Sequence, residues 1–308
     1  MKFSGRSNGW IRRVAFVCYL AIALAPAVAH SDSILDPVGP IGAGDRIILL
    51  DAVVIMLAIV IPTMIATLAF AWWYRRSNTR AVYRPNFTYS GRIELVTWSI
   101  PTLVIFFLGG VIWIGSQRLD PFRPLSSTVK PLEIEAIAFD WKWLFIYPEQ
   151  GIASINRLVI PVGRPLHFRI TSASVFNVFF VPRLGSMIYA MNGMVSQLNL
   201  QANKSGTYLG FSAQFSGDGF PDMKFETVAM PAVRFAGWAT NVKGAALDRA
   251  AAGQLLKQSR AVAPYTYRSV DLSLFDAIVS RQLGPGEGPL SATGGLGGQK
   301  AISHEGTP

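Results

Sequence analysis

The sequence GTYLGFSAQFSGDGFPDMKFE, residues 206–226, contains two strand-like segments joined by a turn. Residues 208–215 and 223–229 are rich in aromatic and apolar side chains, and they flank the turn-forming hexapeptide at residues 216–221. A loop that joins two strands at the open end of a β-sandwich is a common position for metal ligands. This hexapeptide offers only glycine, proline, serine, phenylalanine and one aspartate. We therefore predict a loop of the metal-binding type from which the ligands are missing.

Cysteine and histidine are too scarce for most redox metal centres. The only cysteine is Cys18, and the histidines are His30, His167 and His304. Thiolate-bridged copper and iron–sulfur centres require cysteine, and most copper sites need several histidines. His167 alternates with apolar neighbours in residues 165–171, so it is expected on the polar face of a strand as an ordinary surface histidine. The sequence predicts no metal or other cofactor in this chain.

The composition indicates a membrane protein. Of 308 residues, 51% are hydrophobic and only 15% are charged, with a net charge of +10. The basic residues form no patch interleaved with aromatic side chains, as a nucleic-acid site would need, and they cluster beside apolar segments instead. They are interpreted as topology signals, and no nucleic-acid partner is expected.

Residues 1–29 have the order of a secretory signal peptide. Basic residues precede an apolar core at residues 14–25, and a small-x-small tripeptide follows. Cleavage is expected before His30, which leaves residues 30–46 as an external N-terminal segment without cysteine. The alternative is an uncleaved anchor helix, although the core is short for a membrane span.

Two uncharged runs, residues 52–71 and 95–115, are long enough to cross a hydrocarbon core of about 30 Å as helices. We expect transmembrane helices at residues 47–74 and 93–116, with aromatic side chains near their ends. The intervening residues 75–92 carry five arginines and no acidic residue, so this loop is expected to be cytoplasmic. The sequence predicts a helical hairpin in the lipid membrane that carries an external domain.

The external domain, residues 130–236, is predicted to be an antiparallel β-sandwich. Apolar residues alternate with glutamates at 132–136, and short strand-like segments separated by proline and glycine follow. Besides the two strands of the opening stretch, these segments are residues 155–160, 166–171, 175–181 and 194–202.

The chain is predicted to end in a short helical tail at residues 237–283. Residues 244–259 favour a helix by composition, and Leu274 and Ile278 share one helix face. Residues 284–308 are rich in glycine and expected to be disordered. The expected fold class is an α+β membrane protein: a two-helix transmembrane hairpin, an antiparallel β-sandwich and a helical C-terminal tail.

Three motifs carry a resemblance to a known family. They are ELVTWSIP at residues 94–101, DWKWLFIYPEQG at residues 140–151 and FFVPRLGSMIYAM at residues 179–191. With the signal and the hairpin, these motifs make the chain resemble subunit II of the haem–copper terminal oxidases, and they are similar to the cytochrome bo-type ubiquinol oxidases in particular. The resemblance covers residues 34–240 and implies a cupredoxin-like external domain.

The resemblance also implies where copper ligands would lie. In cytochrome c oxidases this domain holds CuA, a dinuclear copper centre that receives electrons from cytochrome c. The matching positions in this chain are Asn177, Phe215, Gly217, Gly219, Met223 and Glu226. A lone methionine and a lone glutamate cannot assemble a thiolate-bridged copper pair. Residues 130–236 are therefore expected to form a cupredoxin-like domain without copper.

The implied function is that of a non-redox subunit II of a proton-pumping quinol oxidase, which oxidises quinol and reduces O2 to water. The haems and the copper, and the contact with quinol, are then expected in partner subunit I, beside smaller membrane subunits. The external domain shows no acidic excess for docking basic cytochrome c, since residues 130–234 hold nine basic and seven acidic residues. The expected location is a bacterial inner membrane with the C-terminal domain in the periplasm.

Glu94 is the expected functional residue of the hairpin. A carboxylate at the cytoplasmic start of the second helix is either an interfacial charge paired with Arg92 or a functional group facing a helix bundle. The resemblance implies the second role, at the mouth of the proton pathway called the K-channel.

Other readings stay open. One is a CuA-type cytochrome c oxidase subunit II, which the missing ligands contradict. Another is a membrane-tethered periplasmic binding module, with or without copper held by methionines; the candidates are Met187, Met191, Met194 and Met223. Trp141 and Trp143 are expected to be structural and to pack the sandwich against subunit I.

Overall fold

The computed structural model describes residues 34–82, 84–260 and 262–283. The expected signal peptide at residues 1–29 and the glycine-rich tail at residues 284–308 lie outside the described residues, as do residues 30–33 of the expected external segment.

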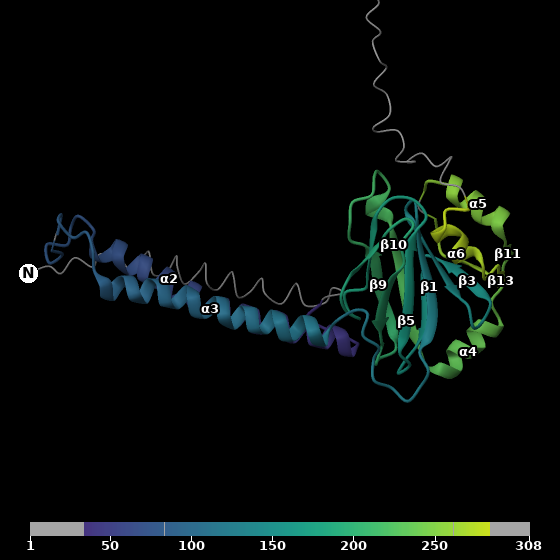
Figure 1. Cartoon of the computed structure of the whole chain (residues 1–308), viewed down its shortest axis with the longest axis horizontal. Coiled ribbons are helices and arrows are strands. Elements are labelled where there is room, and N and C mark those ends of the chain that lie inside the picture. The colour runs from purple at the N-terminus through teal and green to yellow at the C-terminus, as the bar shows by residue number, and fades with distance from the viewer. Residues whose placement is uncertain (1–33, 83, 261, 284–308) are drawn as a thin grey trace, which may run out of the picture.

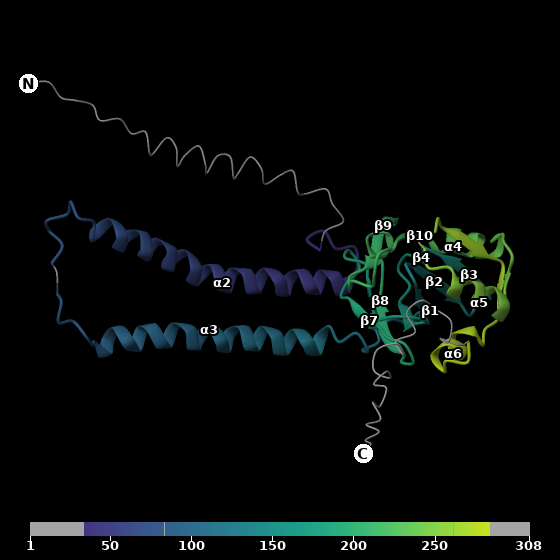
Figure 2. The same ribbon diagram turned by 90° about the horizontal axis from the view of Figure 1, so that it is seen from above.

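Two long apolar helices, α2 (Pro40–Trp73) and α3 (Gly91–Arg118), run antiparallel and side by side, and they project from one side of a β-rich domain (Figures 1 and 2). Both are long and apolar enough to cross a membrane. Each extends beyond the expected span of residues 47–74 or 93–116. Proline at the first helical position starts α2 early, and the additional turns connect the apolar runs to the domain.

The start of α2 is fixed to the domain by hydrogen bonds. The backbone N–H of Val38 donates to the carbonyl of Arg183 at 2.8 Å, and that of Gly42 donates to the carbonyl of Leu184 at 2.9 Å. The hydroxyl of Ser186 donates to the carboxylate of Asp45 at 3.0 Å. The segment between the strands β6 (Asn177–Phe180) and β7 (Ile188–Ala190) therefore lies directly against the external end of the hairpin.

The domain is a sandwich of two sheets. Sheet A has the strand order β12 (Tyr265–Tyr267), β3 (Ile152–Ile155), β2 (Lys142–Tyr147), β1 (Leu132–Phe139), β5 (Leu166–Ser172) and β8 (Ser196–Leu200). Sheet B has the order β4 (Arg157–Pro161), β10 (Lys224–Met230), β9 (Gly206–Ser212), β6 (Asn177–Phe180) and β7 (Ile188–Ala190). Each sheet has one edge strand at the hairpin end of the domain, β8 in sheet A and β7 in sheet B (Figure 2). Every strand that the sequence predicted is present, but β2, β3, β7 and the strands of the tail were not foreseen.

The expectation of a purely antiparallel sandwich is wrong at two places. Strand β1 pairs with β5 in parallel, with Leu132 opposite Leu166, and β10 pairs with β4 in parallel, with Val228 opposite Val159. The chain passes from sheet B to sheet A between β4 and β5, so strands that run in the same direction become neighbours. The cause is this connection between the layers, which local alternation does not reveal.

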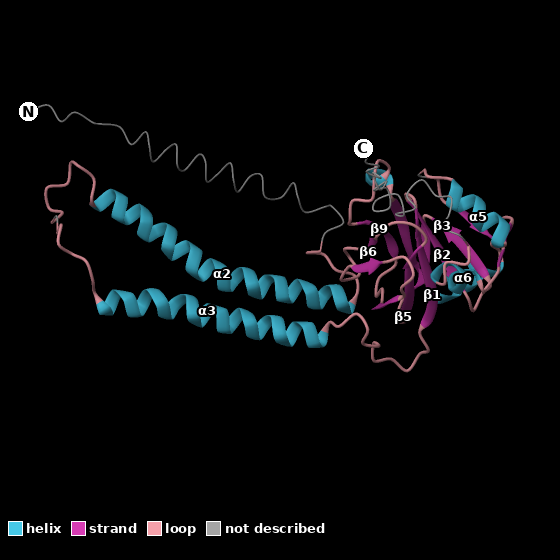
Figure 3. Ribbon diagram, turned by 45° about the horizontal axis from the view of Figure 1, so that its top comes forward, coloured by secondary structure: helices cyan, strands magenta, loops and turns pink. Residues whose placement is uncertain are grey.

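Strand β1 of sheet A carries apolar side chains on both of its faces. Ile134, Ala136 and Ala138 of β1 lie in the core between the sheets, whereas Ile137 and Phe139 lie in a second core on the outer face. The tail covers this second core with α5 (Arg249–Lys257) and α6 (Leu274–Val279), on the side of the domain away from the hairpin (Figures 1 and 3).

The tail is more than the helical segment that the sequence predicted. It adds β12 to the edge of sheet A and forms a two-stranded sheet from β11 (Ala246–Leu247) and β13 (Ser269–Val270). A further helix, α4 (Ala232–Thr240), begins inside the expected β-domain. Residues after 236 are therefore built into the sandwich, because they bury apolar surface of sheet A that would otherwise face water.

Candidate functional site

The six predicted ligand positions lie in three different environments around the β9–β10 loop. Asn177 is completely buried in β6, where its amide donates to the carbonyl of Val175 at 3.1 Å and its Oδ1 accepts from the hydroxyl of Ser212 at 3.0 Å. The backbone N–H of Ser212 donates to the carbonyl of Met223 at 3.1 Å. Ser212 thus connects Asn177 to Met223, whose own side chain is only 1% exposed.

Phe215 and Glu226 face away from this buried group. Phe215 is 69% exposed and contacts the edge of the Phe220 ring, with the ring centroids 5.7 Å apart. Glu226 forms an ion pair with Arg157 at 2.8 Å, and both side chains are about half exposed. The structure therefore does not bring the six positions together around one centre.

Trp141 fills the space beside Gly217 and Gly219. A Cβ atom placed on Gly219 would lie 2.2 Å from Cδ2 of the indole, and one placed on Gly217 would lie 3.3 Å from its Cζ2. The indole N–H donates to the carbonyl of Ser216 at 3.2 Å. Sequence reasoning missed this contact, because Trp141 and the two glycines are far apart in the sequence. The signal that was available is the pair of glycines in the loop, since glycine often marks a place where another group approaches the backbone closely.

Trp141 and Lys142 extend from one turn in different directions. Trp141 adopts a left-handed backbone with φ of 59° in the turn between β1 and β2. Lys142 is fully buried, and its ammonium donates to the carbonyls of Asp140 and Gln258. Burial lowers the pKa of Lys142 to about 8, while the charge of Asp140 opposes this shift. The turn thus contacts the β9–β10 loop through Trp141 and the tail through Lys142.

The expectation that Trp143 packs against a partner subunit is wrong. Its side chain is completely buried between the sheets, where it contacts Phe145, Phe179 and Phe225. A residue without exposed surface cannot contact another chain, so Trp143 belongs to the core of the sandwich.

The four candidate methionines differ in burial. Met223 is buried and accepts a weak contact from the hydroxyl of Ser216 at 4.0 Å, whereas Met187 and Met194 are more than half exposed. Among the described residues, no group of three or more histidine, cysteine, aspartate and glutamate side chains is placed to hold a metal ion. Of the four methionines, only Met223 is buried next to the β9–β10 loop.

A second polar cluster lies on the outer face of sheet A. The guanidinium of Arg169 contacts Glu135 at 2.7 Å and Asp276 of α6 at 2.9 Å, and it stacks on the ring of Phe275. Burial raises the pKa of Glu135 from 4.5 to about 7, although the charge of Arg169 lowers it. This cluster joins the tail to the sheet.

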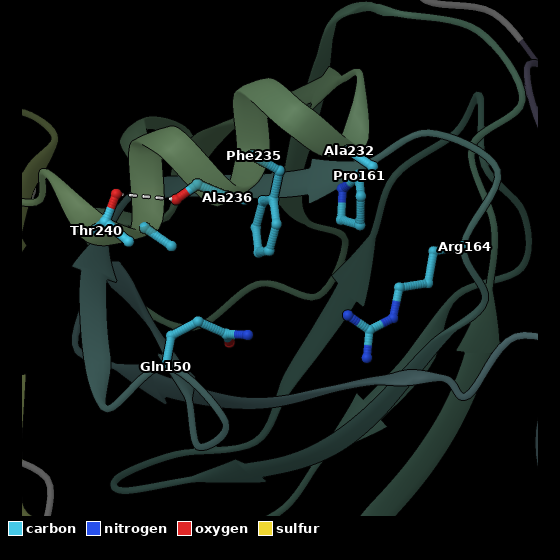
Figure 4. A pocket seen from close by; sticks show the side chains of 8 residues that line it. Gln150, Pro161, Arg164, Ala232, Phe235, Ala236 and Thr240 are labelled. Atoms are coloured by element: carbon cyan, nitrogen blue, oxygen red, sulfur yellow. Dashed lines mark hydrogen bonds between the residues drawn. The ribbon is translucent and has the colours of Figure 1, made fainter.

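A cavity of about 300 Å³ lies between α4 and the turns of the sandwich (Figure 4). Phe235 and Ala236 of α4 line one side, and Gln150 and Arg164 point toward it from the other side. Arg164 already donates to the carbonyl of Lys130 at 2.9 Å and to the carboxylate of Glu149 at 3.0 Å. Its guanidinium therefore has a structural role in joining the segment before β1 to the turns around the cavity.

Glu94 lies in the first turn of α3, at the other end of the hairpin from the domain. Its side chain is exposed, and its backbone carbonyl accepts from the hydroxyl of Thr97 at 3.0 Å. Within the described part of the chain, its carboxylate forms no ion pair with Arg92 or another basic side chain. The structure thus separates Glu94 from the β9–β10 loop by the length of a membrane helix.

Comparison with known proteins identifies the class of protein to which this chain belongs. Residues 150–228 match the protein family described as cytochrome c oxidase subunit II, periplasmic domain. This match covers the sandwich from the β2–β3 turn into β10, and the two apolar helices precede it. The class is thus a bacterial membrane protein with two transmembrane helices and a periplasmic domain of the oxidase subunit II type.

Three relatives show to which family within this class the chain belongs. Ubiquinol oxidase subunit 2 of Acetobacter aceti is 46% identical over 89% of this chain and 90% of its own length. Cytochrome bo(3) ubiquinol oxidase subunit 2 of Pseudomonas aeruginosa is 43% identical over 89% of this chain and 84% of its own. Quinol oxidase subunit 2 of Bacillus cereus is 32% identical over 79% of this chain and 84% of its own. The chain belongs to the family of quinol oxidase subunits 2, and it is a subunit of an oxidoreductase complex.

Proposed function

We propose that this chain is the subunit of a quinol-oxidising terminal oxidase that carries no redox metal and supports the catalytic subunit. The single observation that carries the proposal is the packing of Trp141 on Gly219, because the indole occupies the space that a ligand side chain would need. The residues at the other ligand positions supply no thiolate and no imidazole. They do not fit a dinuclear copper centre, so no electron-transfer step is assigned to this domain.

The haems, the copper and the contact with quinol then belong to a partner membrane subunit. Quinol dissolves in the membrane, so it can reach such a partner without passing through the periplasmic domain. In this arrangement the hairpin and the sandwich anchor and cover the partner, and smaller membrane subunits complete the complex. The relatives described above are subunits of quinol oxidases, which supports this assignment.

Glu94 has a distinct role in this proposal, which is to pass protons from the cytoplasmic surface to the partner. A carboxylate at the cytoplasmic end of a membrane helix can collect protons when it faces a hydrated entrance. The absence of an ion pair with Arg92 in the described chain favours this role over that of an interfacial charge.

Copper loading tests the proposal on the purified complex. The expected result is no copper bound by this chain, measured by elemental analysis after the chain has been separated from its partners, and no purple colour. The partner should carry haem, visible in the optical spectrum. Stoichiometric, strongly coloured copper on this chain would contradict the proposal; colourless stoichiometric copper would favour a methionine site.

A further inference from the structure

A cavity of about 230 Å³ lies between α2 and α3, near the ends of these helices that join the external domain (Figure 2). We call it the hairpin cavity. Apolar side chains from both helices line it, and they include Ile47, Ile48, Val111 and Ile114. Its charged residues are Asp51 of α2 and Arg118 of α3. An apolar wall with one group of each charge is more than a membrane anchor needs.

The two helices touch directly beside this cavity. A Cβ atom on Gly115 of α3 would lie 2.6 Å from Cδ1 of Ile48, and one on Gly44 of α2 would lie 2.7 Å from Cδ2 of Leu119. The two glycines therefore let the helices approach without displacing these side chains. All four residues also line the hairpin cavity, so contact between the helices bounds it.

Asp51 and Arg118 have no partner for their charges in the part of the chain that the structure describes. Neither side chain forms a salt bridge or a side-chain hydrogen bond there, with the other or with a third residue. An ionisable side chain in a membrane helix is costly, and it ordinarily pairs with another group or marks a binding site. Two such side chains of opposite charge share this one cavity.

The directions of the two helices bring these side chains toward the same level. In a helix the Cα–Cβ bonds tilt toward the N-terminus. Helices α2 and α3 are antiparallel, and α2 begins at the domain while α3 ends there. Asp51 therefore leans toward the periplasm and Arg118 leans into the membrane. The carboxylate and the guanidinium approach the cavity from opposite sides.

The hairpin cavity lies at the depth of the lipid headgroups. Asp45, near the periplasmic end of α2, accepts a hydrogen bond from Ser186 of the domain at 3.0 Å, and Asp51 lies about 9 Å deeper along the helix. On α3, Trp113 is 70% exposed and lies about 7.5 Å deeper than Arg118. Tryptophan is enriched where the headgroups meet the hydrocarbon core. The space between these levels is therefore that of the headgroups of the periplasmic leaflet.

We propose that the hairpin cavity binds the headgroup of one phospholipid that carries both an ammonium and a phosphate group, as phosphatidylethanolamine does. The ammonium donates to the carboxylate of Asp51, and the phosphate accepts from the guanidinium of Arg118. The acyl chains lie along Ile47 and Ile114, which are 60% and 52% exposed. This inference goes beyond the proposed function, because a lipid site requires neither quinol nor a redox metal.

A lipid with both charges fits better than the other occupants of such a space. The phosphate of an anionic lipid would pair with Arg118 but leave Asp51 without a partner beside a negative charge. A helix of another membrane subunit would have to supply both a cation and an anion at this depth, where membrane helices are mainly apolar. One zwitterionic headgroup supplies both charges.

The test uses the complex purified in detergent through the full chain, with phosphatidylethanolamine that carries a photoactivatable acyl chain as the probe. Mass spectrometry is expected to find labelled peptides from residues 44–51 and 111–119. Asp51→Asn and Arg118→Gln should each lower this labelling at least tenfold, which corresponds to about 1.4 kcal/mol of binding. Arg46→Gln is the matched control, because Arg46 is exposed at the same end of α2 but does not line the cavity. Unchanged labelling in both cavity variants, or an equal loss in the control, would overturn the inference.

Phosphatidylglycerol with the same photoactivatable chain tests the headgroup. It is expected to label these peptides at least tenfold less than phosphatidylethanolamine. Equal labelling by both lipids that is insensitive to Asp51→Asn would overturn the inference, because it would show a contact with phosphate alone.

A photocrosslinking residue at position 114 gives a further readout that needs no change of charge. In the native membrane we expect its covalent adduct to have the mass of a phosphatidylethanolamine. An adduct with another protein instead would overturn the inference and show that a neighbouring subunit fills the hairpin cavity.

Discussion

Trp141 and Gly219 are packed so closely that the indole leaves no room for a side chain: a Cβ atom on Gly219 would lie 2.2 Å from Cδ2 of the ring. Real Cβ atoms do not approach other atoms to this distance, so any substitution must displace Trp141 or the loop. The turn that holds Trp141 also holds the tail through Lys142, which is buried beside the carbonyl of Gln258. The β9–β10 loop, the turn and the tail therefore form one packed unit.

Gly219→Ala is expected to destabilise the domain by about 1–3 kcal/mol, the typical cost of overpacking. The measurement is thermal unfolding of the purified chain in detergent, followed by near-ultraviolet circular dichroism. Gly237→Ala is the control, because nothing lies within 4 Å of a Cβ at that position of α4 and alanine favours a helix. If Trp141→Ala fails to reduce the cost of Gly219→Ala in a double-mutant cycle, the steric explanation is wrong.

The two tryptophans are expected to differ in their contribution to stability. Trp143→Ala removes a completely buried ring and is expected to cost about 3–5 kcal/mol, whereas Trp141→Ala removes a partly exposed ring and should cost less. Both variants are expected to lower the amount of assembled complex more than its turnover per haem. Normal assembly with lost turnover would instead give Trp141 a role in electron transfer.

The hairpin and most strands could be predicted because their patterns are local. Uncharged runs of membrane length define α2 and α3, and alternating glutamates define the start of β1. Strand β2 was missed because Lys142–Tyr147 is buried on both faces, so its sequence does not alternate. The parallel partners of β1 and β10 depend on how the chain crosses between the sheets, which no short window of sequence contains.

The candidate site was only partly predictable for the same reason. The missing copper ligands could be found by position, because the loop residues are contiguous in the sequence. The contact between Trp141 and Gly219 joins residues far apart in the chain, and it depends on the left-handed backbone of Trp141. Such a conformation is costly for a bulky residue, and tertiary packing has to impose it.

Glu135→Gln is expected to change how stability depends on pH. Burial raises the pKa of Glu135 to about 7 in the folded chain, from 4.5. The folded state then binds more protons than the unfolded state, so stability present below pH 4.5 is lost as the pH rises through 7. Glutamine does not titrate, so unfolding temperatures of the variant should improve relative to the parent between pH 4.5 and 8.

Glu149→Gln is a control for which the stability relative to the parent is expected to change with pH in the opposite direction. The hydrogen bond from Lys130 lowers the pKa of Glu149 below its usual value, so its stabilising effect is present at neutral pH and lost as the pH falls. The variant should lose stability relative to the parent as the pH rises from 3 to 7. If the unfolding temperatures of the parent and both variants changed with pH in parallel, the pKa values of Glu135 and Glu149 would not be shifted as described.

Glu94→Gln is expected to slow quinol oxidase turnover without affecting assembly. Glutamine keeps the size and hydrogen-bonding capacity of the side chain but cannot bind and release protons. Glu94 is exposed in the first turn of α3 and forms no ion pair with Arg92 in the part of the chain that the structure describes. The substitution should therefore have little effect on folding or assembly. We expect a loss on the order of tenfold, which equals about 1.4 kcal/mol in the activation barrier.

The decisive measurement is proton uptake during reduction of the oxygen site, compared with turnover in the same preparation. Loss of a group that admits protons should slow proton uptake and turnover together. Glu94→Asp, which keeps a carboxylate, should restore part of each rate. Glu133→Gln is the control, because this half-exposed carboxylate lies on the external domain rather than in the hairpin. If the Glu94→Gln complex takes up protons and reduces O2 at the parental rate from pH 6 to 8, the carboxylate is an interfacial charge and proton entry must use another residue.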